Sequence, residues 1–269
     1  MIEIFKQHLP KDVTPEEKLN RVRELLQIIC LKIMYDKNNF DHMAFVGGTA
    51  LRILFDLRRF SEDLDFSLID SKGYDFSRVN EELLKGLKLY GLNAESKVKG
   101  EKNVQSILVK FSGMLKDLGL SSLPDQKLSI KIEVDANPPA GWRLERSFIS
   151  KTYMFTLTHF DLPSMYATKL HACFYRKFTK GRDFYDLIWY LSKRIQPNYT
   201  LLNHAVQQTQ GRSPKINQGN FKEFLLRNIK NIDFSAARKD VERFLEDKAE
   251  LKLFDTEAFK SAVATAYRY

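Results

Sequence analysis

The sequence contains little of what several large classes of protein need. Of its 269 residues only two are cysteines, Cys30 and Cys173, and neither belongs to a CxxC motif or stands at ligand spacing from a histidine. A zinc site is therefore not expected. Both cysteines fall in apolar stretches of helical spacing, where a free thiol is usually a small core residue. This usage of cysteine predicts a cytoplasmic protein.

Long apolar runs are also absent. No stretch approaches the roughly 20 residues that a membrane-spanning helix needs. The first residues, MIEIFKQHLPKD, lack the basic, apolar and small-residue regions of a secretion signal. There is no GxSxG motif, and the five histidines are scattered along the chain. We therefore expect no membrane contact and no hydrolase of the serine or cysteine type.

What the sequence does have is positive charge. Its formal net charge is +9, from 43 Lys and Arg against 34 Asp and Glu. A basic balance favours an anionic partner such as nucleic acid, although charge alone is equally compatible with a surface that only keeps the protein soluble. The hydrophobic content of 43% and the charged content of 29% are ordinary for a globular protein.

The local patterns change at about residue 157. Before that point strand-like segments alternate with helical ones, and the first long helix is expected to begin at Pro15 with Thr14 as its N-cap. After it, the patterned segments all have helical spacing. We predict a two-lobed α+β fold, with a mixed sheet flanked by helices over residues 1–157 and a helical lobe over residues 158–269.

The stretch FVGGTALRILF contains a candidate phosphate-binding turn. Gly47 and Gly48 follow a predicted strand and precede a predicted helix, so the backbone can turn tightly and a ligand can approach its N–H groups. A helix N-terminus attracts anions because its first N–H groups are unpaired. Thr49 adds a hydroxyl donor. Since most glycine pairs at such positions are only turns, the prediction depends on the neighbouring residues.

Two aspartates follow in SEDLDFSL, on the next predicted strand. Alternate residues of a strand point to the same side, so Asp63 and Asp65 face together while Leu64 and Phe66 face the core. Paired carboxylates repel each other, and a divalent cation relieves the repulsion. Mg²⁺ is typically held by one or two carboxylates together with substrate phosphates. The turn and the pair therefore predict a site for a nucleoside triphosphate and Mg²⁺, with Mn²⁺ as the alternative metal.

A third carboxylate is expected on the strand predicted within KLSIKIEVDAN. Glu133 and Asp135 lie on one side of this strand. Glu133 is the preferred third metal ligand because it is nearer the middle of the strand, and Asp135 stays open as the alternative. The competing interpretation is an exposed polar strand face that Lys131 shares with both acids.

Charged residues gather again in KLHACFYRKFTKGRDFYDL, in the helical part. The basic members are Lys169, Arg176, Lys177, Lys180 and Arg182. Cations that face a triphosphate stabilise the charge that moves to the leaving pyrophosphate, which makes Lys169 and Arg182 candidate nucleotide ligands. Asp183 is a candidate for orienting the acceptor or the lysine. The simpler interpretations are a solvated basic surface and, for Asp183, a helix cap.

At these residues the sequence resembles the AbiEii/AbiGii-type nucleotidyltransferase toxins, also called type IV toxin–antitoxin toxins, of the polymerase-β-like superfamily. The matching text is GGTALRILF…RRFSEDLDFSL, then IKIEVD, then KLHACFYRKFTKGRDFYDL, in the same order and spacing over about residues 44–190. The resemblance implies an N-terminal nucleotidyltransferase sheet with Gly47, Gly48, Thr49, Asp63 and Asp65, and a helical lobe with Lys169 and Asp183. Some relatives are similar to enzymes that add nucleotides to the 3′ end of tRNA, and the family implies an antitoxin partner.

We therefore expect an enzyme that transfers a nucleotide from a nucleoside triphosphate to a hydroxyl acceptor, with an RNA 3′ end as the expected acceptor. Its catalytic residues would be Asp63, Asp65, Lys169 and Asp183, and Glu133 would complete the metal ligands. One rival is a two-metal nuclease or phosphatase that uses the same carboxylates. The other is a nucleic-acid-binding protein of the same fold without catalysis.

Overall fold

The structure is a computed structural model that describes residues 2–10, 12–100, 103–123, 125–176 and 180–268. The chain separates into two compact units, each described below by itself. Unit 1 consists of Met1–Asp56, Phe60–Asn137 and Glu145–His159, and unit 2 of Leu57–Arg59, Pro138–Leu144 and Phe160–Tyr269. Two short stretches that precede Phe160 in the chain, Leu57–Arg59 and Pro138–Leu144, thus belong to the second unit. The predicted lobe ranges, 1–157 and 158–269, are continuous and stay a prediction.

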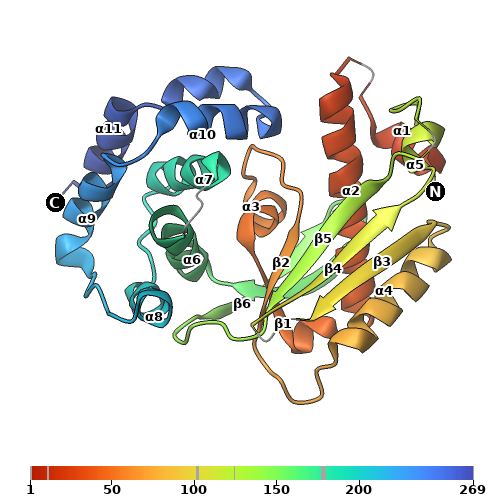
Figure 1. Ribbon diagram of the computed structural model, residues 1–269, viewed down its shortest axis with the longest axis horizontal. Helices are drawn as coiled ribbons and strands as arrows, with labels where there is room; N and C mark the ends of the chain where they lie inside the picture. The colour runs from red at the N-terminus through yellow and green to blue at the C-terminus, as the bar shows by residue number, and fades with distance from the viewer. Residues whose placement is uncertain (1, 11, 101–102, 124, 177–179, 269) are drawn as a thin grey trace. The chain divides into compact units, whose positions relative to one another are not determined.

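Unit 1 contains the strands and the helices that pack on them (Figure 1). Its elements are α1 (Ile2–His8), α2 (Pro15–Asp36), the 3-10 helix η1 (Asn39–Asp41), β1 (Met43–Val46), α3 (Gly47–Phe55), β2 (Leu64–Leu68), α4 (Phe76–Leu89), β3 (Ala94–Gly100), β4 (Val104–Phe111), α5 (Met114–Asp117), β5 (Leu128–Asp135), β6 (Leu144–Ser150) and β7 (Met154–Phe160).

Unit 2 is helical. Its elements are α6 (Leu162–Tyr175), α7 (Gly181–Ser192), α8 (Tyr199–Gln210), α9 (Gln218–Ile229), α10 (Phe234–Val241), the 3-10 helices η2 (Glu242–Phe244) and η3 (Lys248–Leu253), and α11 (Thr256–Ala266). Aromatic side chains fill its core: the rings of Tyr166 and Tyr190 stack with centroids 4.2 Å apart, and both residues are fully buried.

The described residues form one sheet of seven strands in the order β3-β4-β5-β2-β1-β7-β6. The sheet is mixed: β2 runs parallel to β5 and β1 parallel to β7, whereas β1 with β2, β3 with β4, and β4 with β5 are antiparallel. A mixed sheet flanked by helices confirms the predicted α+β class. The central position of β2, between β5 and β1, brings the DLD segment beside both the glycine turn and the KIEVD strand.

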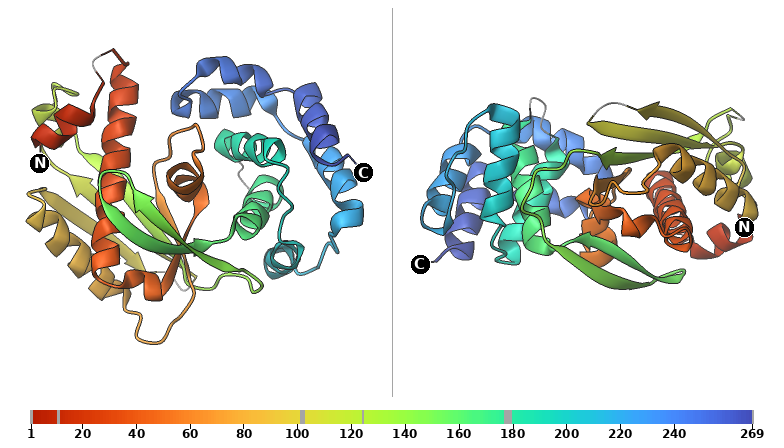
Figure 2. Two further views of the ribbon diagram at one scale, coloured as in Figure 1. Left: turned by 180° about the vertical axis from the view of Figure 1, so that it is seen from behind. Right: turned by 90° about the horizontal axis from the view of Figure 1, so that it is seen from below.

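One face of the sheet packs on helices α2 and α4 (Figure 2). In β5 the apolar residues Leu128, Ile130, Ile132 and Val134 are buried, and the residues between them are half-buried or exposed. Burial on one side and polarity on the other is the usual pattern of an antiparallel sheet that is covered on one face. The polar face of β5, with Lys131 and Glu133, is therefore the other face of the sheet.

Most of the predicted elements are present, and α2 begins at Pro15 as expected, with the Thr14 hydroxyl accepting the backbone N–H of Glu17. Two boundaries near the site differ. The helix α3 begins at Gly47 itself rather than at Thr49, and β2 begins at Leu64, so that Asp63 stands just before the strand. The predicted helix over 162–178 ends at Tyr175, and Lys177 lies outside the described residues.

The prediction missed or misjudged elements where the periodicity was short. Strands β6 and β7 were not predicted, although Phe155, Leu157 and His159 are buried at alternate positions. The helical spacing of AARKDVERFLEDKAEL predicts one helix over residues 236–251. This is wrong in its second half, because α10 ends at Val241 and Phe244 turns into the core through a 3-10 helix. The last helix, α11, was also not predicted.

None of the helices in the described part of the chain is both long and apolar enough to span a membrane.

Candidate active site

The glycine turn of unit 1 lies directly against an aspartate. Strand β1 runs without a loop into α3, and Gly47, at the junction, has a φ of +80°. Residues with a side chain rarely adopt this conformation. A Cβ atom at Gly47 would also overlap the carboxylate oxygen Oδ2 of Asp65. Glycine is needed here both for the turn and for this close approach, so the two ends of the sequence motif do meet in space.

The first turn of α3 is tied to the segment that carries the aspartates. Thr49 is fully buried, and its hydroxyl donates a hydrogen bond to the backbone carbonyl of Asp63. The hydroxyl proton of Thr49 is therefore already donated to the Asp63 carbonyl. This differs from the predicted role of Thr49 as a hydrogen-bond donor to phosphate. The backbone N–H groups remain the groups for an anion, because the N-cap residue Val46 has no polar side chain to cap the helix.

Asp63 and Asp65 face the same side of the chain. Leu64 and Phe66 are buried, with exposed fractions of 0% and 2%, whereas both aspartates are half-buried. Since neighbouring residues of an extended chain alternate in direction, the two carboxylates point away from the helix-covered core. This is the paired arrangement that the sequence predicts.

The strand pairing decides which acid on β5 lies beside this pair. In the parallel register of β2 and β5, Asp65 stands opposite Glu133, and Asp135 stands opposite Ser67. The carboxylate of Asp135 accepts the backbone N–H of Asn137 at 3.0 Å, and burial raises its pKa above the usual value. By register Glu133 is the acid beside Asp65, and Asp135 lies at the end of the strand; the role of Glu133 as third metal ligand stays a prediction.

The structure adds Lys131, which was not predicted as a site residue. Its Nζ lies 2.6 Å from Oε1 of Glu133. The hydrogen bond to Glu133 raises the pKa of Lys131, and the charges of Glu133, Asp63 and Asp65 raise it further, against the effect of partial burial. The sequence feature that could have identified Lys131 as a site residue is its position two residues before Glu133, on the same side of the strand.

The described acids of unit 1 do not by themselves form a preassembled metal site. Within the described residues, no group of three or more His, Cys, Asp or Glu side chains is arranged to hold a metal ion. A site that needs the carboxylates of Asp63 and Asp65 together with phosphate oxygens of a substrate remains compatible with the arrangement.

Two residues of the second predicted cluster, Lys169 and Asp183, belong to a buried network of ion pairs in unit 2, whereas Arg176 and Lys180 are exposed. The ammonium group of Lys169 lies 2.7 Å from Oδ1 of Asp183 and 2.8 Å from Oδ2 of Asp186. Asp186 also receives two hydrogen bonds from the guanidinium group of Arg59, at 2.7 and 2.6 Å. Arg59 and Asp186 are 2% and 0% exposed, and neither was predicted as a site residue.

The charges of this network stabilise one another against burial. Burial alone would lower the pKa of Lys169, but the charges of Asp183 and Asp186 outweigh it and the net shift is upward. Burial alone would raise the pKa of Asp183, but the charge and hydrogen bond of Lys169 outweigh it and the net shift is downward. Lys169 and Asp183 therefore each favour their charged form. The Oδ2 atom of Asp183 is buried and accepts no hydrogen bond from the residues that the structure describes.

Arg182, the other predicted nucleotide ligand, lies at the start of α7. Its guanidinium carbon is 4.2 Å from the centre of the Phe244 ring, a distance typical of a cation–π contact. This contact joins the start of α7 to η2, within unit 2. The role of Arg182 in nucleotide binding stays a prediction.

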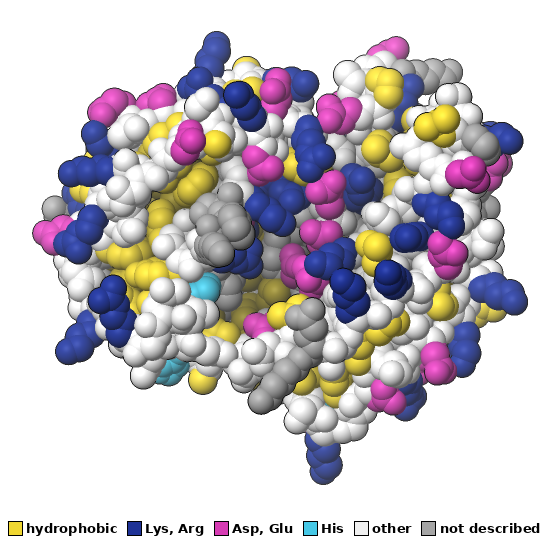
Figure 3. Space-filling model, viewed as in Figure 1, with side chains coloured by type: hydrophobic (Ala, Val, Ile, Leu, Met, Phe, Trp, Pro, Cys, Tyr) yellow, Lys and Arg dark blue, Asp and Glu magenta, His cyan; other side chains and the backbone are white. Residues whose placement is uncertain are grey.

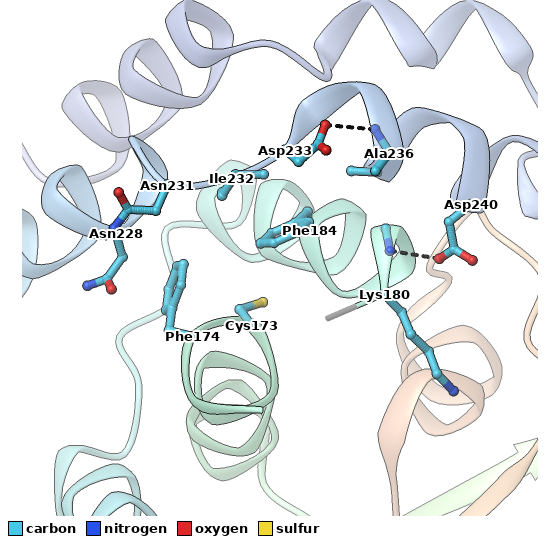
Figure 4. Close-up of a pocket in the computed structure, with 12 residues that line it drawn as sticks. Cys173, Phe174, Lys180, Phe184, Asn228, Asn231, Ile232, Asp233, Ala236 and Asp240 are labelled. Atoms are coloured by element: carbon cyan, nitrogen blue, oxygen red, sulfur yellow. Dashed lines mark hydrogen bonds between the residues drawn. The ribbon is translucent and has the colours of Figure 1, made fainter. Parts of the chain in front are cut away.

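A cavity of about 540 Å³ in unit 2 is lined by none of the predicted catalytic, metal-binding or nucleotide-binding residues, although Lys180 of the basic cluster lies on its wall (Figure 4). Its polar groups already serve the fold: Asp240 accepts the backbone N–H of Gly181 at 2.7 Å, and Asp233 accepts that of Ala236 at 2.9 Å. Asn228 donates to the carbonyl of Phe224 at 2.8 Å. The cavity is a gap between helices α6, α7, α9 and α10, and its polar groups give no sign of a ligand.

Comparison with known proteins decides the family. The sequence profile described as "Nucleotidyl transferase AbiEii toxin, Type IV TA system" matches residues 30–265. The chain belongs to the AbiEii family. The match extends from α2 to α11, so it includes both units. The predicted family is thereby confirmed, and membership supports a nucleotidyltransferase as the activity.

Two solved structures resemble this AbiEii protein over most of their length. JHP933 from Helicobacter pylori shares 18% of its sequence, with a TM-score of 0.59 over 91% of this chain and 92% of that one. A candidate nucleotidyltransferase from H. pylori shares 19%, with a TM-score of 0.53 over 96% of this chain and 94% of that one. At such identities the likeness shows the fold alone. The search of curated proteins found no match.

Proposed function

We propose that this AbiEii protein transfers a nucleotide from a nucleoside triphosphate to a hydroxyl group, with Mg²⁺ as its metal and an RNA 3′ end as the acceptor. The observation that carries the proposal is the contact of the Gly47 turn with the Asp65 carboxylate, with Glu133 in register on the next strand. An anion-binding turn and a carboxylate group at one place suit a metal–triphosphate complex.

The residues of unit 1 fit a divalent metal by the chemistry of their donors. Asp63 and Asp65 would hold it, and the glycine at position 47 keeps the space in front of Asp65 clear of a side chain. When bound, Mg²⁺ would supply positive charge to the oxygens of the phosphoryl group that is transferred. The backbone N–H groups of Gly48 and Thr49, at the start of α3, would bind the triphosphate tail and orient it.

The reaction joins the acceptor oxygen to the α-phosphorus and breaks the bond to the bridging oxygen of the β-phosphate. Pyrophosphate leaves, and the hydroxyl proton is released. In unit 2 we propose Lys169, Asp183 and Arg182 as further participants, as the family resemblance implies. The buried Oδ2 of Asp183 supports a role as acceptor of a ligand hydrogen bond, because it has no partner within the described residues. Lys169 as it stands is held by two carboxylates.

An anionic acceptor is supported by lysines on the polar face of the sheet. The register aligns Lys99 with Ser106, Ser106 with Glu133, and Glu133 with Asp65, so one row of residues crosses four strands from the edge to the carboxylates. Lys97, on the same side of β3, is exposed like Lys99. Figure 3 shows Lys and Arg side chains gathered beside Asp and Glu side chains over these strands. Phosphates of a nucleic acid would meet the lysines before its end reached the carboxylates.

Activity is tested by incubating the protein with total RNA, Mg²⁺ and each labelled nucleoside triphosphate in turn. We expect labelled, lengthened RNA with the wild type and a rate lower by about 10²- to 10³-fold with Asp65→Asn, the scale of losing one preorganised electrostatic group. Asp117→Asn, an exposed aspartate at the end of α5, is the matched control and should keep full activity. Shortened RNA would indicate the nuclease, and an active Asp65→Asn variant would overturn the site.

Binding of the acceptor is tested by salt dependence. We expect Lys97→Gln/Lys99→Gln to weaken RNA binding and to reduce the slope of log affinity against log salt by about 0.7 for each RNA phosphate that the variant no longer neutralises. The control is Lys85→Gln/Lys88→Gln, which removes the same charge from exposed positions of α4, on the helix-covered side of the sheet. Equal effects of the two double variants would show that net charge alone, and not this face, attracts RNA.

The family description also supports a toxin with an antitoxin partner. We therefore propose that expression of the wild-type protein arrests growth through its transfer activity. Growth should be normal when Asp65→Asn is expressed at the same level. Growth arrest by the Asp65→Asn variant would separate toxicity from nucleotide transfer.

A further inference from the structure

Lys131 lies among the carboxylates that would bind a metal ion in the proposed site. Lys131 and Glu133 lie on the same side of β5, and the pairing of Leu64 with Ile132 places them next to Asp63 and Asp65, respectively. The Lys131 ammonium is bound to Glu133 at 2.6 Å. One ammonium group is thus built into a set of three carboxylates.

The charges of Lys131 and the three carboxylates affect how a metal ion can bind. The formal charges of three carboxylates and one ammonium sum to −2, and a divalent cation carries the opposite charge. A metal that enters without a nucleotide meets the repulsion of Lys131 and finds Glu133 already paired. The Lys131 side chain is 42% exposed and has a flexible four-carbon stem, so its head group can move to another anion without disturbing the core.

We propose that Lys131 is a resident counter-cation that competes with the divalent metal, so that the metal binds tightly only together with the nucleotide. The inference rests on the proposed function. When the metal–nucleotide complex arrives, the triphosphate becomes the partner of Lys131 and Glu133 is released toward the metal. Lys131 then both limits metal binding in the resting protein and contributes a positive charge to the bound triphosphate.

The test measures Mn²⁺ binding rather than activity. Free Mn²⁺ is followed by its electron paramagnetic resonance signal, with and without a non-hydrolysable nucleoside triphosphate. Without the nucleotide, Lys131→Met should bind Mn²⁺ at least about tenfold more tightly than the wild type, because the competing unit charge a few ångströms away is gone. Lys131→Arg keeps the charge and should bind Mn²⁺ like the wild type.

The nucleotide separates the two roles of Lys131. In the wild type, the triphosphate should strongly increase the affinity for Mn²⁺. In Lys131→Met this increase should be smaller by a factor of about ten, because the same lysine charge weakens Mn²⁺ binding without the nucleotide and favours the triphosphate with it. Lys110→Met is the matched control: it removes a lysine of the same sheet face, on β4, and should leave both affinities unchanged. If Lys131→Met does not fold, Lys131→Gln serves the same purpose, with thermal unfolding as the check.

The outcomes distinguish this inference from the proposed function. Lys131→Met could bind Mn²⁺ as the wild type does or more weakly, while Asp65→Asn loses the Mn²⁺ binding that the wild type shows with the nucleotide. This result would overturn the role of Lys131 and leave the metal site intact. No Mn²⁺ binding by either protein, even with the nucleotide, overturns the metal site and the proposed function together. If Lys131→Met binds Mn²⁺ more tightly than the wild type and Asp65→Asn abolishes that binding, the result supports both the role of Lys131 and the proposed function.

Discussion

Both units of this AbiEii protein place a lysine between carboxylates, but the surroundings of the two lysines are opposite. In unit 2, Lys169 joins Arg59, Asp183 and Asp186 in a buried network with equal numbers of positive and negative charges. In unit 1, Lys131 is 42% exposed and faces an excess of acids. A balanced buried network stabilises the fold, whereas a partly exposed lysine beside several acids can exchange its partner for a ligand.

The largest effect on stability is expected where the buried network is broken. Arg59→Met should lower the free energy of unfolding by about 3–5 kcal/mol, because it leaves Asp186 buried with one partner fewer. The measurement is denaturant unfolding. Arg58→Met is the control, since Arg58 is 63% exposed in its pair with Glu250 and should cost no more than about 1 kcal/mol. Similar losses in both variants would contradict the contrast between buried and exposed charge.

In unit 1 the sharpest structural change is Gly47→Ala. The new Cβ would stand in a φ of +80° and overlap Asp65, so unfolding should become easier by about 1–3 kcal/mol, and nucleotide transfer should be lost as well. Gly91→Ala is the matched control, because Gly91 has a φ of +69° but no atom within 4 Å of the added Cβ. It reports the cost of the backbone conformation alone.

A second-site change sharpens this experiment. Shortening the acid in Gly47→Ala/Asp65→Ser removes the carboxylate oxygen from the overlap but leaves the Cβ atom of residue 65 at 3.0 Å, so it should restore part of the stability but none of the activity. If Gly47→Ala and Gly91→Ala lose the same stability and Gly47→Ala stays active, the close approach of Gly47 to Asp65 has no functional meaning.

The two regions also differ in how far the sequence could predict them. The turn and the carboxylates of unit 1 follow from local patterns: an apolar strand, glycines, and acids at alternate positions. What the sequence could not supply was the parallel register of β2 and β5, which sets Glu133 rather than Asp135 beside Asp65. Register depends on packing across the whole sheet, whereas the local pattern favoured Glu133 only for its place in mid-strand and left Asp135 as the alternative.

The network of unit 2 was harder to predict because its contacts are distant in sequence. Arg59 and Asp186 are separated by 127 residues, and Arg59 stands beside a second arginine with an exposed side chain. Nothing in the spacing of charges shows which of the two arginines is buried. The β6–β7 hairpin was missed for a related reason: it follows the break at NPPAGW, and the last residues of β7 are buried on both sides, which hides the alternation of a strand.

The smallest expected effect is a dependence of stability on pH that arises from the buried network. The folded pKa of Asp183 is lowered from the ordinary value of 3.8, because the charge and hydrogen bond of Lys169 outweigh burial. A lowered pKa adds stability above the ordinary pKa, and that stability is lost as the pH falls through the folded pKa. Asp183→Asn should therefore be less stable than the wild type at pH 6, with a difference that shrinks below about pH 4.

Denaturant unfolding from pH 6 to pH 3 measures this difference in stability, with Asp117→Asn as the exposed control whose difference should stay near zero. A constant difference between wild type and Asp183→Asn would mean that Asp183 acts through its shape and hydrogen bonds, and that its charge adds nothing to the network.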